Sequence, residues 1–240
     1  MARALSKLGH CSRSEATRLI RAGRVALNGK PHRDPETPVC LGKDRIEIDG
    51  SRLRAEAKVY LMLNKPRGVV TTASDEKGRK TVYALLPENL PWVAPVGRLD
   101  KASEGLLLVT NDSEWSARVQ SPATHLDKTY HMQVGIVGDD QLTRKLQQGL
   151  QTSDGELLRV KQASVLRTGG KNTWLAIVLA EGRNRHIRRM FEALSIEVLR
   201  LVRVAIGPLQ LGQLAKGSSR RLTTAEKMIL DDAMRKRHKP

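Results

Sequence analysis

The chain has 240 residues, of which 40% are hydrophobic, so it is long enough for one or two folded domains and is not expected to be disordered. Its 42 lysines and arginines against 25 aspartates and glutamates give a formal net charge of +17, which is typical of a protein that binds nucleic acid or an anionic membrane. No apolar stretch approaches the roughly 20 residues that span a bilayer, and no signal peptide is visible, so we expect a cytoplasmic nucleic-acid-binding protein without membrane contact.

The first predicted elements form a small basic module. Helical spacing predicts a helix over residues 2–8, and the capping box at residues 12–15 opens a second helix that ends at Gly23. Two short strands are predicted to follow, the first of them ending in a tight Asn-Gly turn, at residues 24–27 and 45–48.

Basic side chains are dense in this module. A solvated helix face is the ordinary explanation for such charges, but this segment contains only one acid before Asp34, so we expect an RNA-facing surface. The candidate RNA-binding residues are Arg3, Lys7, Arg13, Arg18, Arg21 and Arg24.

This segment also resembles the small RNA-binding module named after ribosomal protein S4. The resemblance rests on GHCSRSEA at residues 9–16, IRAGRV at residues 20–25 and LNG at residues 27–29. The first helix of such modules begins several residues earlier, so we expect either a slightly truncated module or a misplaced start codon.

Residues 51–57 are polar and charged and predict a short linker to a second domain that begins at Lys58. Apolar runs and alternation predict strands at residues 59–63, 106–110, 128–134, 157–166, 174–180 and 198–205, with residues 69–72 continuing the sheet. Helices are predicted at residues 115–119, 140–149 and 185–194, and from residue 224 after a second capping box.

In the second domain strands outnumber helices and do not alternate with them, which predicts an α+β fold. We expect a module over residues 1–53, a domain with a mixed, mainly antiparallel sheet over residues 58–222, and a C-terminal helix with a basic tail over residues 223–240. The end of that tail, residues 235–240, is expected to be frayed.

Residues that could hold a metal ion or form a disulfide are scattered. Cys11 and Cys40 lie far apart and outside any C-x-x-C pair, and the six histidines form no metal-binding pattern. No G-x-G-x-x-G follows a predicted strand, which counts against a dinucleotide-binding fold and against a methyltransferase. We therefore expect no bound metal.

A lone aspartate, Asp100, stands between an apolar segment that ends in Val96-Gly97 and the apolar run from Leu106. Most such aspartates are turn formers. This one would lie at the rim of a sheet, where loops on a rigid scaffold commonly carry function.

Two further segments could act with Asp100. The first is KTY at residues 128–130, and the second is EGRNRHIRRM at residues 181–190, where basic side chains open a helix. Arg188 is flanked by Ile187 and Met190, which must point inward, and a buried arginine needs an anion. If Asp100 is that anion, the guanidinium would keep the carboxylate ionised, and an ionised carboxylate can act as nucleophile or base at a sugar carbon.

Over residues 2–226 the chain resembles the bacterial ribosomal RNA pseudouridine synthases that join an S4-like module to a catalytic domain. The matching motifs are LNKP at 63–66, GRLD at 97–100, GLLL at 105–108, KTY at 128–130, EGRNR at 181–185, IRRM at 187–190 and IG at 206–207. Each motif is weak alone, but together they occur in the family's order.

The resemblance implies a role for each matching residue. Asp100 would attack the uridine sugar or assist departure of the base, Arg188 would pair with Asp100, and Tyr130 would stack on the uracil and help remove the proton from its carbon five. Arg98 would contact phosphate. Further substrate or RNA contacts are expected from Leu99, Lys65, Lys128, Arg183, Arg185, Ile187 and Arg189. The reaction needs no cofactor.

Two other classes of protein fit parts of the sequence. A non-catalytic ribosome-associated RNA-binding protein would have lost Asp100, Tyr130 or Arg188, and all three are present. An RNA methyltransferase with the same module would carry a glycine-rich cofactor loop, and no such loop follows a predicted strand. We therefore expect a monomeric enzyme that converts one uridine, flipped out of its stack, in ribosomal RNA or a precursor particle, with the large subunit favoured by the motifs around Lys65 and Arg183.

Overall fold

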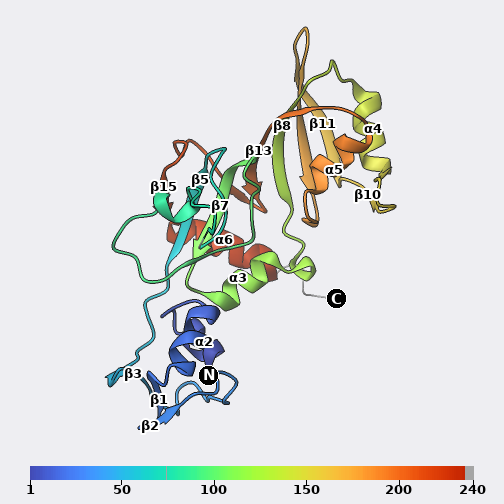
Figure 1. The fold of residues 1–240 in the computed structure, drawn as a ribbon. Coiled ribbons are helices and arrows are strands. Elements are labelled where there is room, and N and C mark those ends of the chain that lie inside the picture. The colour runs from blue at the N-terminus through green and yellow to red at the C-terminus, as the bar shows by residue number, and fades with distance from the viewer. Residues whose placement is uncertain (74, 236–240) are drawn as a thin grey trace.

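The computed structural model describes residues 1–73 and 75–235 (Figure 1). Its N-terminal module pairs two helices with a small antiparallel sheet of strand order β2-β1-β3-β4. The elements are α1 Ala2–Lys7, α2 Arg13–Arg21, β1 Val25–Leu27, β2 Lys30–His32, β3 Ile46–Ile48 and β4 Ser51–Arg52. Strand β4 corrects the predicted linker, because its two residues pair with β3 and belong to the module.

Local sequence signals account for this module. The Ser12 hydroxyl accepts a hydrogen bond of 3.0 Å from the Glu15 amide, which caps α2 as the capping box predicted. Asn28 and Gly29 both have positive φ, 53° and 82°, as the predicted tight turn between β1 and β2 requires. The apolar faces of both helices pack on Val25 to form a separate small core.

The module contacts the second domain through α1. Lys7 forms an ion pair of 2.6 Å with Glu114 of α3, Ser113–Gln120. The backbone amide of Glu56 donates to the Leu8 carbonyl at 3.0 Å, and the Lys58 amine donates to the Lys7 carbonyl at 3.2 Å. In Figure 1 the blue module accordingly lies beside α3.

The second domain is built on a nine-stranded sheet whose main path runs β11-β12-β8-β13-β7-β5-β15. Its pairs are antiparallel except for β13 with β7, so the predicted α+β fold with a mixed, mainly antiparallel sheet is confirmed. The strands are β5 Tyr60–Lys65, β6 Ala94–Pro95, β7 Glu104–Thr110, β8 Lys128–Val134, β11 Gln162–Thr168, β12 Thr173–Leu179, β13 Val198–Ile206, β14 Leu209–Gln210 and β15 Ser219–Arg221.

Helices cover the two halves of this sheet separately. Helices α4, Asp140–Gln148, and α5, His186–Ala193, lie with the β8, β11 and β12 half, whereas α3 and α6, Thr224–Arg235, lie with the β5 and β7 half (Figure 1). The apolar core that includes Met132 and Phe191 also takes in Leu63 and Leu107 of β5 and β7, whereas a separate core includes Trp115 and Leu230. Short 3-10 helices occur at Val82–Leu85 and Pro122–Thr124.

Side chains cap the starts of α4 and α6 in this domain, and the capping box of α6 is the one predicted from the sequence. The Asp139 carboxylate accepts from the amides of Gln141 and Leu142 at the start of α4. At α6 the capping box is reciprocal, because the Thr223 amide donates to Glu226 at 2.8 Å and the Glu226 amide donates to the Thr223 hydroxyl at 3.1 Å.

Two strand predictions were wrong. Residues 157–166 do not form one strand, because β10, Leu157–Leu158, turns aside to pair with β9, Leu150–Gln151, before β11 begins. Residues 69–72 contribute only an isolated bridge between Val70 and Thr81. Across the described ranges, no helix is both long enough and apolar enough to cross a membrane. Of the tail predicted to fray, residues 236–240 lie outside the described residues.

Candidate active site

The two halves of the large sheet join where β7 runs parallel to β13, and Gly105 makes this junction possible. Its φ of +102° is unfavourable for any residue with a side chain, and an added Cβ would stand 2.2 Å from the Arg203 carbonyl oxygen. Asp100 lies in the loop that enters β7 beside this junction, and Tyr130 of β8 stands opposite Arg203 in the strand register. Segments far apart in the chain therefore meet here.

A cleft of about 490 Å³ opens at this junction. Its lining combines the loop that holds Asp100, the start of β8, the turn into α5 and the middle of β13. The structure thus brings together the three segments that the sequence analysis singled out. Nine of the predicted site residues line the cleft: Asp100, Tyr130, Arg188, Arg98, Leu99, Lys128, Arg183, Arg185 and Ile187.

Lys65 organises the loop that holds Asp100, instead of contacting RNA as expected. Its side chain is fully buried and does not line the cleft. The amine donates to three backbone carbonyls, those of Pro66 at 3.1 Å, Asp100 at 3.0 Å and Ser103 at 2.8 Å. Burial lowers the pKa of Lys65 to about 8, against the opposing effect of the Asp100 and Glu104 charges.

Arg188 reaches the same loop, but the predicted ion pair with Asp100 was wrong. Its Nη2 donates to the Ala102 carbonyl at 3.1 Å, and no ion pair joins Arg188 to Asp100 within the described residues. The two charges still interact, because burial lowers the pKa of Arg188 and the nearby Asp100 charge raises it. The Asp100 carboxylate, which is half-buried, is left accessible to a ligand in the cleft.

Arg203 also belongs to the site, although it was not predicted from the sequence. It is 6% exposed, lines the cleft, and donates from Nε to the Leu106 carbonyl at 2.7 Å. Its charge, together with burial as the larger cause, lowers the pKa of Lys128. The sequence does contain a pattern that could have identified Arg203. In the strand at residues 198–206 it is the one cation among apolar residues on the face that is buried.

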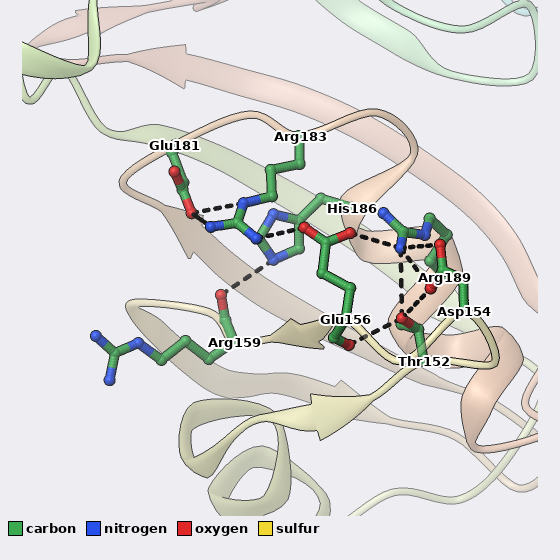
Figure 2. A network of polar contacts seen from close by, with 8 residues as sticks. All are labelled: Thr152, Asp154, Glu156, Arg159, Glu181, Arg183, His186 and Arg189. Atoms are coloured by element: carbon green, nitrogen blue, oxygen red, sulfur yellow. Dashed lines mark hydrogen bonds and ion pairs between the residues drawn. The ribbon is translucent and has the colours of Figure 1, made fainter.

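The predicted RNA contacts Arg183 and Arg189 are both tied to acidic side chains (Figure 2). Arg183 pairs with Glu181 and Glu156, while Arg189 pairs with Glu156 at 2.6 Å and with Asp154 at 2.7 Å. Arg189 does not line the cleft, whereas Arg183 does. Hydrogen bonds from the two guanidinium groups, first Arg183 and then Arg189, lower the pKa of Glu156.

The candidate RNA-binding residues of the module fall into two groups. Arg3, Arg13 and Arg21 are exposed and form no hydrogen bond or ion pair through their side chains within residues 1–73 and 75–235. The other three are paired with acids: Arg18 with Glu15, Arg24 with Asp49, and Lys7 with Glu114. Lys7 therefore joins the module to α3 and does not belong to a free RNA-facing surface.

A basic module joined to a domain whose cleft combines a carboxylate, a tyrosine and arginines is the arrangement of an enzyme that acts on nucleic acid. A family model described as RNA pseudouridylate synthase matches residues 59–193, and a model of the S4 domain matches residues 2–46. The chain belongs to the RNA pseudouridylate synthase family and carries an S4 domain before the catalytic part. It is therefore an isomerase whose substrate is RNA.

Individual relatives agree with this assignment. The chain is 38% identical over 224 residues to ribosomal large subunit pseudouridine synthase B of Bacillus subtilis, covering 92% of this chain and 91% of that protein. A protein of the same name from Yersinia pestis is 36% identical, over 86% of this chain and 67% of that protein. A crystal structure of a pseudouridylate synthase matches with a TM-score of 0.65 at 30% identity, covering 94% of this chain and 96% of the other.

Proposed function

We propose that this protein converts one uridine of large-subunit ribosomal RNA to pseudouridine, with Asp100 as the nucleophile acting on a nucleotide flipped out of its stack. The observation that carries the proposal is the meeting of Asp100, Tyr130 and Arg188 in a single cleft. The choice of the large subunit is supported by the names of the Bacillus subtilis and Yersinia pestis relatives, both of which are ribosomal large subunit pseudouridine synthases B.

In this mechanism the Asp100 carboxylate attacks C1′ of the uridine while the N1–C1′ bond breaks and its electron pair leaves with the uracil. The uracil rotates until C5 faces C1′, and the new carbon–carbon bond forms as the carboxylate departs. C5 then loses its proton and N1 gains one, so the product is an isomer of the substrate. Tyr130 stacks against the uracil and assists removal of the C5 proton.

Arg188 and Lys65 prepare the carboxylate for this attack without pairing with it. Lys65 holds the backbone carbonyls of Asp100 and Ser103, and Arg188 holds that of Ala102, so the loop is held at the nucleophile and at the residues that follow it. A nucleophile that is held in place in the free enzyme loses less entropy at the transition state. The carboxylate oxygens remain available for C1′ because the two cations bind backbone oxygens instead.

Basic side chains supply the RNA binding. Extruding the uridine costs a few kcal/mol, which phosphate contacts distributed over the RNA can offset. We assign these contacts to Arg98, Lys128 and Arg185 at the cleft rim and to the N-terminal module. We place this module at residues 1–53, the catalytic domain at residues 58–222 and the C-terminal helix from residue 223. The partner is ribosomal RNA or its precursor particle, bound by a monomer in the cytoplasm.

Release of tritium from RNA labelled at C5 of uracil tests this proposal, because isomerisation must remove that hydrogen. We expect release from large-subunit RNA by the parent protein, and a rate lower by roughly 10³-fold or more for Asp100→Asn. The matched control is Asp232→Asn, an exposed residue of α6, which should release tritium at the parental rate. Release from small-subunit RNA alone would overturn the assigned substrate. Tight binding without release from either RNA or its particle would indicate a non-catalytic RNA-binding protein.

A further inference from the structure

We propose that Arg203 is a catalytic residue that donates a hydrogen bond to a carbonyl oxygen of the flipped uracil and stabilises the negative charge of the base while it is detached from the sugar. This inference rests on the proposed function and assigns a further residue to its reaction.

The first observation is a buried cation without an anionic partner. Arg203 is 6% exposed, and its Nη2 is buried and makes no hydrogen bond within the described residues. A buried guanidinium that lacks a compensating anion or acceptor is costly to the fold. Because Arg203 lines the cleft, the missing acceptor can be supplied by a ligand there.

The second observation is that the neighbouring carboxylate is used elsewhere. Glu104 stands on the adjacent strand, one residue before Gly105, the residue that pairs with Arg203 in the register. Its carboxylate is bound by Arg200 at 3.0 Å and by Lys216 at 2.6 Å. The charge of Arg203 is thus not neutralised by the acid closest to it in the strand register.

The third observation is that the guanidinium is held in position before any substrate arrives. Nε is bound to the Leu106 carbonyl at 2.7 Å, which fixes the plane of the group. The absence of a side chain at Gly105 lets β13 approach β7 at this point. Donors that are fixed in advance and directed at developing charge stabilise a transition state without further reorganisation.

The depth of Arg203 favours the base over a phosphate. Around it the cleft is lined by apolar side chains, those of Leu99, Leu201 and Ile206, which suit a flat ring. Exposed cations at the rim, Arg98 and Arg185, are placed for the RNA backbone. Tyr130, opposite Arg203 on β8, would cover the ring of the same base.

The chemistry explains why such a donor would accelerate the reaction. When the N1–C1′ bond breaks, the electron pair stays with the uracil and spreads over N1, O2 and O4. After C5 has bonded to C1′ and lost its proton, and N1 has gained one, the ring is neutral again. A hydrogen bond from Arg203 is therefore strongest in the detached state, and only interactions that strengthen in this way raise kcat.

The experiment combines Arg203→Gln and Arg203→Lys with RNA in which the carbonyl oxygens are replaced. Ribosomal RNA transcripts are made with uridine, 2-thiouridine or 4-thiouridine, and product formation is followed by nucleoside mass spectrometry. Sulfur accepts hydrogen bonds more weakly than oxygen. We expect kcat to fall by about 10²-fold in Arg203→Gln on the uridine transcript, with a smaller change in KM.

The decisive quantity is the ratio of the rates on uridine and thiouridine transcripts, measured within each enzyme. In the parent, the thio substitution at the contacted oxygen should alter the rate through the Arg203 hydrogen bond. In Arg203→Gln and Arg203→Lys that ratio should change by at least about fivefold, since interacting groups are non-additive. The matched control is Arg200→Lys on the same strand, whose ratio should equal that of the parent.

Unchanged ratios for both thio transcripts in the Arg203 variants would overturn the inference, as would parental kcat in Arg203→Gln. The Arg203→Lys variant keeps the positive charge, so it provides the ratio if Arg203→Gln does not fold, with thermal melting as the check. Absence of product from the parent on the uridine transcript would instead overturn the proposed function.

Discussion

The exposed arginines of the S4 module and the buried cations of the catalytic part are chemically alike, but the structure holds them differently. In the module, Arg3, Arg13 and Arg21 are exposed and make no side-chain hydrogen bond or ion pair within the described residues. In the catalytic part, Lys65 binds three carbonyls and Arg203 binds one, and both are buried.

This difference separates two uses of positive charge. Exposed cations attract the RNA backbone over a distance, act nearly independently of one another, and are screened by salt. Buried cations hold a loop or a donor in one position, and their energies depend on burial and on geometry. Substitutions in one group should therefore leave the properties that depend on the other group unchanged.

Gly105→Ala should be the most damaging change on the buried side. The new Cβ would overlap the Arg203 carbonyl at a backbone angle that favours glycine, so the free energy of unfolding should fall by about 4 kcal/mol. Urea unfolding measures this loss. Gly170→Ala is the matched control, because no atom lies within 4 Å of its added Cβ, and it should be near neutral. Equal small effects at both sites would show that β7 and β13 are not in close approach.

The burial of Lys65 should make the stability of the folded protein depend on pH. The folded Lys65 pKa of about 8 lies below its ordinary value of 10.5, so between these values the unfolded chain binds more protons and rising pH favours the folded state. Over this window the parent should gain about 3 kcal/mol relative to Lys65→Met. Urea unfolding of both proteins at pH 8 and pH 10.5 measures the gain. Parallel changes in the two proteins would mean that Lys65 is not desolvated.

The exposed arginines of the module should affect binding and leave stability unchanged. Replacing Arg3, Arg13 and Arg21 by Gln should make the slope of log affinity against log salt concentration shallower by about 2 for single-stranded RNA. The melting temperature should stay at its parental value. The contrasting variant is Arg220→Gln, which loses a pair with Glu226 of 2.6 Å and should lower stability without altering the salt slope. An unchanged salt slope together with a lower melting temperature in the Arg3, Arg13 and Arg21 variant would contradict the distinction between the two groups.

The smallest effect is expected at the start of α6. Arg220 lowers the pKa of Glu226 to about 2, so the stability contributed by this carboxylate is present above its ordinary pKa of 4.5 and is lost as the pH falls through 2. Glu226→Gln should cost about 1 kcal/mol at pH 7, and the difference from the parent should vanish near pH 2. Thermal melting across this range measures it, and a difference independent of pH would rule out the ionic contribution.

Much of the architecture was predictable because it depends on local signals. The capping boxes at Ser12 and Thr223 and the turn at Asn28 act within a few residues, and each is formed as expected. The strand error at residues 157–166 has a non-local cause, since Leu157 and Leu158 pair with β9 and not with the main sheet. Apolar periodicity marks a segment as a strand but does not identify its partner.

The two-part organisation, the α+β class, the family and the segments around Asp100, Tyr130 and Arg188 were predictable, because motifs and periodicities are read along the chain. The contacts of each cation were not predictable from these patterns. The tertiary structure directed Lys65 and Arg188 to backbone carbonyls, Arg189 to Asp154 and Glu156, and Arg203 into the cleft. Strand pairing and burial bring together residues that are distant in sequence, and these contacts determine the partner of a charged side chain. The residue type alone does not identify that partner.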